Sequence, residues 1–184
     1  MMRSEKSLRL EKIWRKLAAD SGFGMPRQND FKAHQIPDLL PDFTVGKVTD
    51  TGVNVVMAGS NVIGRFSGEI TGQDYMQFIQ KHQRPFMLSI LQQVCARPVG
   101  ICIQMQSEFE RGYMLKLEVT LLPVRDSDGA SEFAIALSVP APDKGATLAT
   151  PFLGDPKVAD WQGPMAWIDL GAGVPRIASA VGMT

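Results

Sequence analysis

Three stretches in the second half of the chain alternate apolar and polar residues with a period of two. They run from Ile101 to Phe109, from Tyr113 to Leu121 and from Phe133 to Val139. Such alternation is typical of antiparallel strands with one buried and one solvated face. Two further β-rich runs, 43–48 and 53–58, are joined by a polar turn and predict a hairpin. The pattern therefore predicts five strands.

Apolar residues at helical spacing predict two main helices. The first spans residues 8–19 and the second runs from Pro85 to the Arg97-Pro98 pair that ends it. Short helical pieces are expected within 60–66 and 73–79. Because the short helical pieces and the second main helix fall between the second and third strands, we predict an α+β domain. Its five-stranded antiparallel sheet is expected to carry the helices on one face.

The N-terminal helix has a broad apolar stripe for its length. An isolated helix of about three turns is marginal in water, so the stripe must dock on another surface. We predict that it contacts a second subunit and makes the protein a homodimer. Docking on the solvated sheet face around Cys102, Met114 and Leu122 is the alternative. The stripe consists of Leu10, Ile13, Trp14 and Leu17.

The composition changes after Pro140. Glycine, proline and alanine supply 20 of the last 45 residues, and periodicity is lost. We therefore divide the chain into a flanking helix (1–24), a domain (25–139) and a tail (140–184) that docks on the domain or on a partner. The residues expected to anchor the tail are Phe152, Trp161, Trp167 and Ile168.

The overall charge argues against some classes of partner. Among 184 residues, 19 basic and 19 acidic side chains give a formal net charge of zero. General electrostatic attraction to nucleic acid or to an anionic membrane therefore has no support. The N-terminus lacks a signal-peptide pattern, and no apolar run approaches the roughly 20 residues of a membrane span. We expect a cytoplasmic protein with no nucleic-acid or membrane partner.

Motifs for catalysis are weak. The segment Gly59–Gly64 resembles a phosphate loop, but Arg65 and Phe66 follow where lysine and a hydroxyl residue are required. No serine lies in a nucleophile elbow, and His34 and His82 lack ligand spacing. The two cysteines are expected to be free thiols. We therefore predict no catalytic residue, no metal and no cofactor, and hence no enzyme.

Several short motifs resemble the PAS-like family found widely in alphaproteobacteria. The likeness covers about residues 8–139 and implies a role in signal sensing or protein docking, without naming one ligand. The motifs lie at 13–17 (IWRKL), 25–26 (MP), 36–41 (IPDLLP), 57–60 (MAGS), 64–65 (GR), 70–72 (ITG), 97–99 (RPV) and 121–124 (LLPV).

The resemblance also implies where a ligand would bind. PAS domains hold small molecules between the long helix and the sheet. The alternative is that the residues expected there form a closed core without a ligand. Arg65 is the one charged residue that could take part in such a ligand site. It could bind a carboxylate of the ligand, or it could form an ion pair at the surface. The cavity candidates besides Arg65 are Phe66, Phe78, Phe86, Ile90, Val94, Ile103, Met105, Leu117, Val119 and Ile135.

Two functions follow from this comparison. The first is a regulatory sensor or interaction domain in signalling. The 45-residue tail is too short to be a kinase or cyclase domain. The signalling output of the protein is therefore expected to act in trans on a partner protein. The alternative is a small-molecule sensor with a dedicated apolar cavity, and a cryptic enzyme is a minor alternative.

Overall fold

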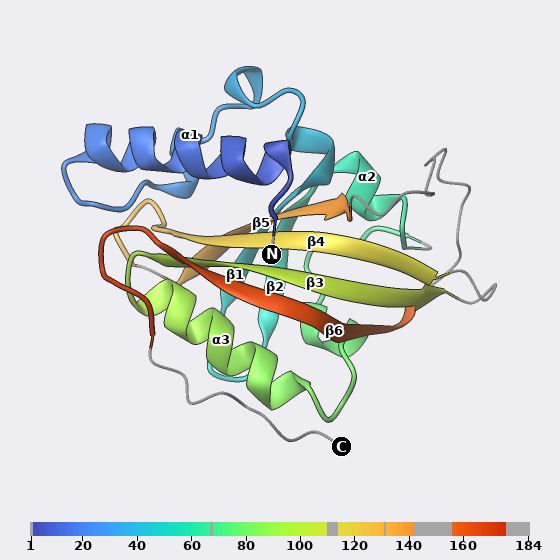
Figure 1. Cartoon of the computed structure of the whole chain (residues 1–184). Helices are drawn as coiled ribbons and strands as arrows, with labels where there is room; N and C mark the ends of the chain where they lie inside the picture. The colour runs from blue at the N-terminus through green and yellow to red at the C-terminus, as the bar shows by residue number, and fades with distance from the viewer. Residues whose placement is uncertain (1, 67, 110–113, 131, 142–155, 176–184) are drawn as a thin grey trace.

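One antiparallel sheet forms the centre of the protein (Figure 1). The computed structural model describes residues 2–66, 68–109, 114–130, 132–141 and 156–175. The strands are β1 (Phe43–Val48), β2 (Val53–Ala58), β3 (Val99–Phe109), β4 (Met114–Val124), β5 (Phe133–Pro140) and β6 (Pro156–Asp169). They lie in the order β2-β1-β5-β4-β3-β6. The predicted α+β class is confirmed, with six strands instead of five.

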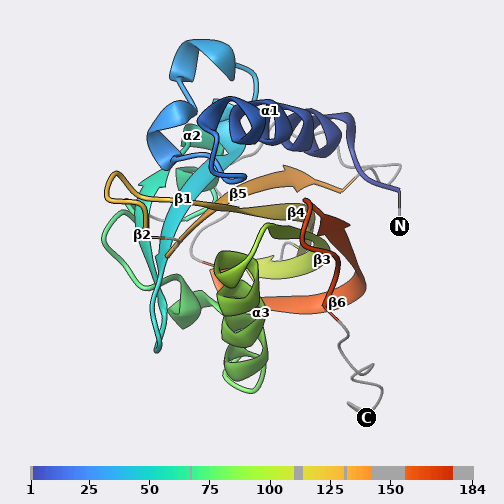
Figure 2. The same ribbon diagram turned by 90° about the vertical axis from the view of Figure 1, so that its left-hand side faces the viewer.

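The helices cover both faces of this sheet. Figure 2 shows α1 over one face and α3 over the other. The long helix after the second strand packs on one face, as predicted, and the flanking helix α1 covers the opposite face. We call the α1 side the outer face and the α3 side the inner face. The α-helices are α1 (Glu5–Ser21), α2 (Ser60–Ile63) and α3 (Arg84–Ala96). The 3-10 turns are η1 (Gln28–Asp30), η2 (Ala33–Gln35), η3 (Leu40–Asp42) and η4 (Tyr75–Phe78).

Polar contacts fix both the ends of α1 and its position on the sheet. Ser4 caps the helix by accepting from the Ser7 amide, and Gly22 ends it in the left-handed conformation (φ 68°). The fully buried Glu118 of β4 accepts hydrogen bonds from the amide and the hydroxyl of Ser4. Further along, the Trp14 indole donates to the Pro123 carbonyl at 2.6 Å. The helix is therefore anchored at both its start and its middle.

The apolar stripe of α1 is buried within the chain. Leu10 is 0% exposed and Trp14 is 1% exposed, and both pack in one core cluster with Cys102 and Leu122. Ile13 and Leu17 are partly buried. This is the alternative docking on the sheet that the sequence left open. It corrects the expected dimer contact, because these side chains already cover the chain's own outer face. Dimerisation itself stays a prediction.

The C-terminal segment contributes the sixth strand, which the sequence did not predict. β6 pairs with β3 from Val99↔Asp169 to Phe109↔Pro156 and covers that edge of the sheet. Among the expected anchors, Trp167 is partly buried against the inner core and Ile168 is buried on the outer face. Phe152 and the side chain of Trp161 lie outside the described part of the structure.

The docking of α1 predicts a contrast between two neighbouring leucines. Leu10→Ala removes a fully buried side chain and should lower the free energy of unfolding by about 2–5 kcal/mol. Leu8→Ala, at a position that is 52% exposed on the same helix, should change it by less than about 0.5 kcal/mol. Urea unfolding measures both variants. Equal effects at the two positions would contradict this docking.

Candidate functional site

The inner face of the central strands carries unusually small side chains. On β5 these are Ala134, Ala136 and Ser138, which alternate with larger residues on the outer face. Beside them on β1, Gly46 pairs with Ala134 and Thr44 pairs with Ala136. A Cβ at Gly46 would lie 2.8 Å from the Val53 side chain, so this position has no room for one. These residues form a shallow strip along the middle of the inner face.

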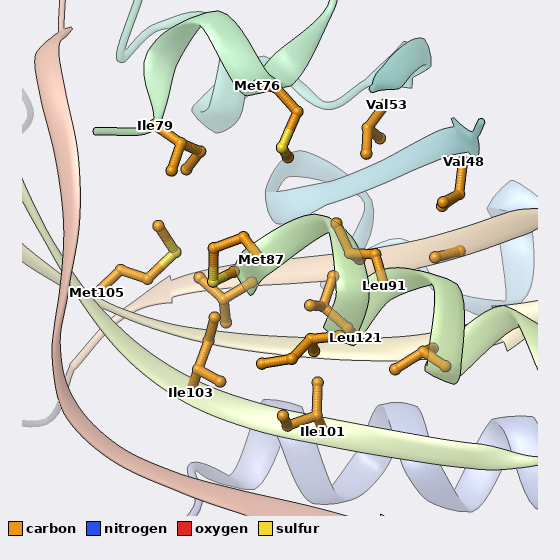
Figure 3. Packing of buried hydrophobic residues seen from close by; sticks show 14 of the residues in the cluster. Val48, Val53, Met76, Ile79, Met87, Leu91, Ile101, Ile103, Met105 and Leu121 are labelled. Atoms are coloured by element: carbon orange, nitrogen blue, oxygen red, sulfur yellow. The ribbon is translucent and has the colours of Figure 1, made fainter. Parts of the chain in front are cut away.

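A cavity of about 100 Å³ lies against this strip. Figure 3 shows the surrounding side chains, with Met87 and Leu91 on α3 and Met105 and Ile103 on β3. Further lining residues come from η4 and from β2, α2 and β4. Because large side chains on the helices face small ones on β1 and β5, the two layers cannot close completely. The cavity follows from this mismatch.

Aromatic rings form part of the lining. The rings of Phe66 and Phe78 meet edge to face with centroids 4.8 Å apart, and Tyr75 lies beside Phe78 at 6.0 Å. Burial raises the pKa of the Tyr75 hydroxyl, while the nearby Arg65 guanidinium opposes this shift. The cavity thus combines an apolar body with a few polar groups, as small-molecule sites do.

Most of the candidate residues lie where the sequence predicted. Ile90 and Val94 are buried in the same core but do not line the cavity, and Phe86 is partly buried against that core. The lining residues missed by sequence reasoning include the small strip and Tyr75, because a search for large apolar side chains passes over them. The candidates that line the cavity are Arg65, Phe66, Phe78, Ile103, Met105, Leu117 and Val119.

Among the candidates, Ile135 lies on the opposite face of the sheet from the cavity, so its prediction was wrong. It pairs with Val45 and Leu122 and is buried in the outer-face cluster under α1. Its assignment to the inner face assumed that only one face of the sheet is buried. Both faces are buried here, so the large residues of β5 lie under α1 and the small ones face the cavity.

Arg65 lines the cavity and is 5% exposed, so it is not a surface arginine. Its guanidinium donates to Asp42 Oδ1 at 3.2 Å, and to the hydroxyl and carbonyl of Ser138 at 3.0 and 2.9 Å. Burial lowers the pKa of the guanidinium, and the Asp42 carboxylate opposes the shift. A buried charge that is paired and hydrogen-bonded in this way stays charged.

Asp42 connects Arg65 to the N-terminal helix. Its carboxylate, 3% exposed, also accepts from Lys6 Nζ at 2.8 Å and from Asn61 Nδ2 at 2.9 Å. Close packing of η3 on α2 holds it there, since a Cβ at Gly59 would lie 2.1 Å from the Leu40 carbonyl oxygen. We call Lys6, Asp42 and Arg65 the ion cluster.

The thiols and histidines do not form a second site within the described residues. Cys95 and Cys102 are buried free thiols, and neither lines the cavity. Burial raises the pKa of Cys95 to about 12 and also raises that of Cys102. A nucleophilic thiol needs the opposite shift. His34 and His82 are exposed.

Two further features are not found in the part of the chain that the structure describes. It holds no group of three or more histidine, cysteine, aspartate and glutamate side chains able to bind a metal ion. Its helices are too short or too polar for any of them to cross a membrane.

A family model described as PAS domain matches residues 2–137. This match includes α1 and β1 to β5 up to Leu137, whereas β6 lies outside it. Among curated proteins, none matches this chain.

Some solved structures are similar to this chain at low sequence identity. VqmA of Vibrio cholerae in a complex with ligand and DNA is 15% identical with a TM-score of 0.49; the match covers 64% of this chain and 55% of that one. The dark state of the blue-light photoreceptor Aureochrome1 LOV is 15% identical with a TM-score of 0.45, covering 64% and 86%. A light-oxygen-voltage domain studied with a flavin analogue is 10% identical with a TM-score of 0.45, covering 60% and 84%.

The ion cluster predicts a contrast between two aspartates that both pair with α1. Asp42→Asn leaves the buried Arg65 without its carboxylate and should lower the free energy of unfolding by about 3–5 kcal/mol. Asp38→Asn removes the exposed pair with Arg9 and should cost less than about 1 kcal/mol. Urea unfolding of both variants measures the contrast. A small effect at Asp42 would mean that the cluster does not hold the buried cation.

Proposed function

The chain belongs to the PAS domain family, and from this membership we propose that it is a sensory domain in signalling whose input is a small molecule bound in the inner-face cavity. The observation that carries the proposal is the strip of small residues on β1 and β5. A core selected only for stability would fill this space, because each unfilled methyl-sized void costs about 1 kcal/mol.

The size of the cavity limits the ligand. A volume of about 100 Å³ is smaller than the 300–1,000 Å³ typical of drug-sized sites. An engineered apolar cavity of about 150 Å³ admits benzene, so this smaller one suits a compact molecule of at most about six non-hydrogen atoms. In this form it has no room for a large ring system. We therefore propose a small, mostly apolar metabolite as the input.

We propose that the output acts in trans on a partner protein. The family supports a signalling role, and the ion cluster provides a physical connection between the cavity wall and α1. The helix has an outward polar side, on which Arg9 and Arg15 form ion pairs while remaining partly exposed. We infer that this side of α1 is the surface on which a partner would detect a change in the domain. A binding role is proposed in preference to a catalytic one, because sensing is the role that the family implies.

Methionine methyl groups allow a direct test of the cavity. Met76, Met87 and Met105 line it, whereas Met114 is exposed at the start of β4. In methyl NMR of methionine-labelled protein, fragments of up to about six non-hydrogen atoms should include binders that shift the three lining methyl groups and leave Met114 unchanged.

A filling variant provides the control for that experiment. Ala136→Leu places three additional carbons in the cavity and should abolish these shifts without unfolding the domain. Ala19→Leu makes the same change at an exposed position of α1 and should retain them. If no fragment shifts the lining methyl groups, or if the shifts persist in Ala136→Leu, the cavity is not the binding site.

A further inference from the structure

The cavity contains a single kind of charge. Of the described residues that line it, only Arg65 is charged. The remaining polar groups are hydroxyls, which include those of Thr44, Tyr75 and Ser138. A desolvated guanidinium beside an apolar space provides strong, oriented donors for a planar anion.

The charges around Arg65 do not balance. The ion cluster contains two cations, Arg65 and Lys6, but only one carboxylate, that of Asp42. Its net charge is therefore +1. The third partner of Asp42, Asn61, is neutral. One anion entering the cavity would bring the net charge of the cluster to zero. It would bind beside Arg65, the cation of the cluster whose charge is least stabilised by solvent.

We propose that the ligand is a small carboxylic acid, bound as the anion, and that its binding tightens the docking of α1. This inference rests on the proposed function of the cavity. The carboxylate binds the Arg65 guanidinium, which makes several directed hydrogen bonds. The short alkyl group occupies the apolar space between α3 and the strip on β5.

The coupling to α1 passes through Asp42. In the structure, Asp42 shares its negative charge between Arg65 and Lys6. When a second carboxylate binds Arg65, it competes with Asp42 for the guanidinium. Asp42 then interacts more strongly with Lys6, and the added anion attracts Lys6 as well. Because thermodynamic coupling is reciprocal, a change that stabilises the docking of α1 on the domain also increases the affinity for the acid.

A matched pair of probes separates charge from shape. Isobutyrate and isobutyramide have the same size and branching, and each has six non-hydrogen atoms, but only the first is an anion. Titration followed by the lining methionine methyl groups should show isobutyrate binding at least about tenfold more tightly than the amide, as expected for a charge-assisted pair. The affinity gain should disappear in Arg65→Gln.

The effect on α1 is measured by hydrogen exchange. With saturating isobutyrate, the backbone amides of α1 should exchange at least about threefold more slowly. Lys6→Gln should abolish this protection, because it removes the cation that connects Asp42 to the helix. Arg9→Gln is the matched control: it removes an exposed pair of the same helix with Asp38, outside the ion cluster, and should retain the protection.

Each outcome decides between the two proposals. If the amide binds as tightly as the acid, the acid proposal is wrong, while the cavity remains a ligand site. If neither probe nor any other fragment shifts the lining methyl groups, both proposals are wrong. If the acid binds but α1 exchanges unchanged, or if Lys6→Gln retains the protection, the coupling through Asp42 is wrong. Because Lys6 is 43% exposed, its substitution should leave the fold intact, so the test does not depend on Arg65→Gln folding.

Discussion

Burial on both faces of one sheet is the constraint on which the structure depends. α1 covers the outer face and α3 covers the inner face, so a central strand such as β5 has no solvated side. Its large residues, Phe133, Ile135 and Leu137, pack in the outer cluster. The positions between them are small and face the helices of the inner layer. The cavity is therefore a consequence of how volume is divided between the two faces.

The ion cluster connects this division to the position of α1. Removing one member of a buried pair is costly because the other charge is left without a partner, whereas an intact buried pair contributes little net stability. The cluster is thus better suited to specifying an arrangement than to strengthening it. It ties the cavity wall at Arg65 to η3 at Asp42 and to α1 at Lys6.

Sequence patterns predicted the strands β1 to β5 and the helices, because alternation and helical spacing are local signals. They did not predict which residues of each strand lie on the inner face of the sheet, since a period of two is the same whether one or both faces are buried. Ile135 was assigned to the wrong face for this reason. β6 was missed because Pro156, Gly163 and Pro164 are unfavourable in strands, and its pairing with β3 joins segments that are far apart in the sequence. The ion cluster joins residues 36 and 23 positions apart. Such a distance leaves no local pattern in the sequence.

The most direct measurement of the central claim is a crystal structure of the protein under pressurised xenon. Xenon enters dry apolar cavities of this kind without requiring a specific ligand. The account predicts a xenon atom between Met87 on α3 and Ala136 on β5, with α1 unmoved on the outer face. A crystal in which the side chains close this space and no xenon binds there would contradict the account, since the inner face would then be an ordinary packed core.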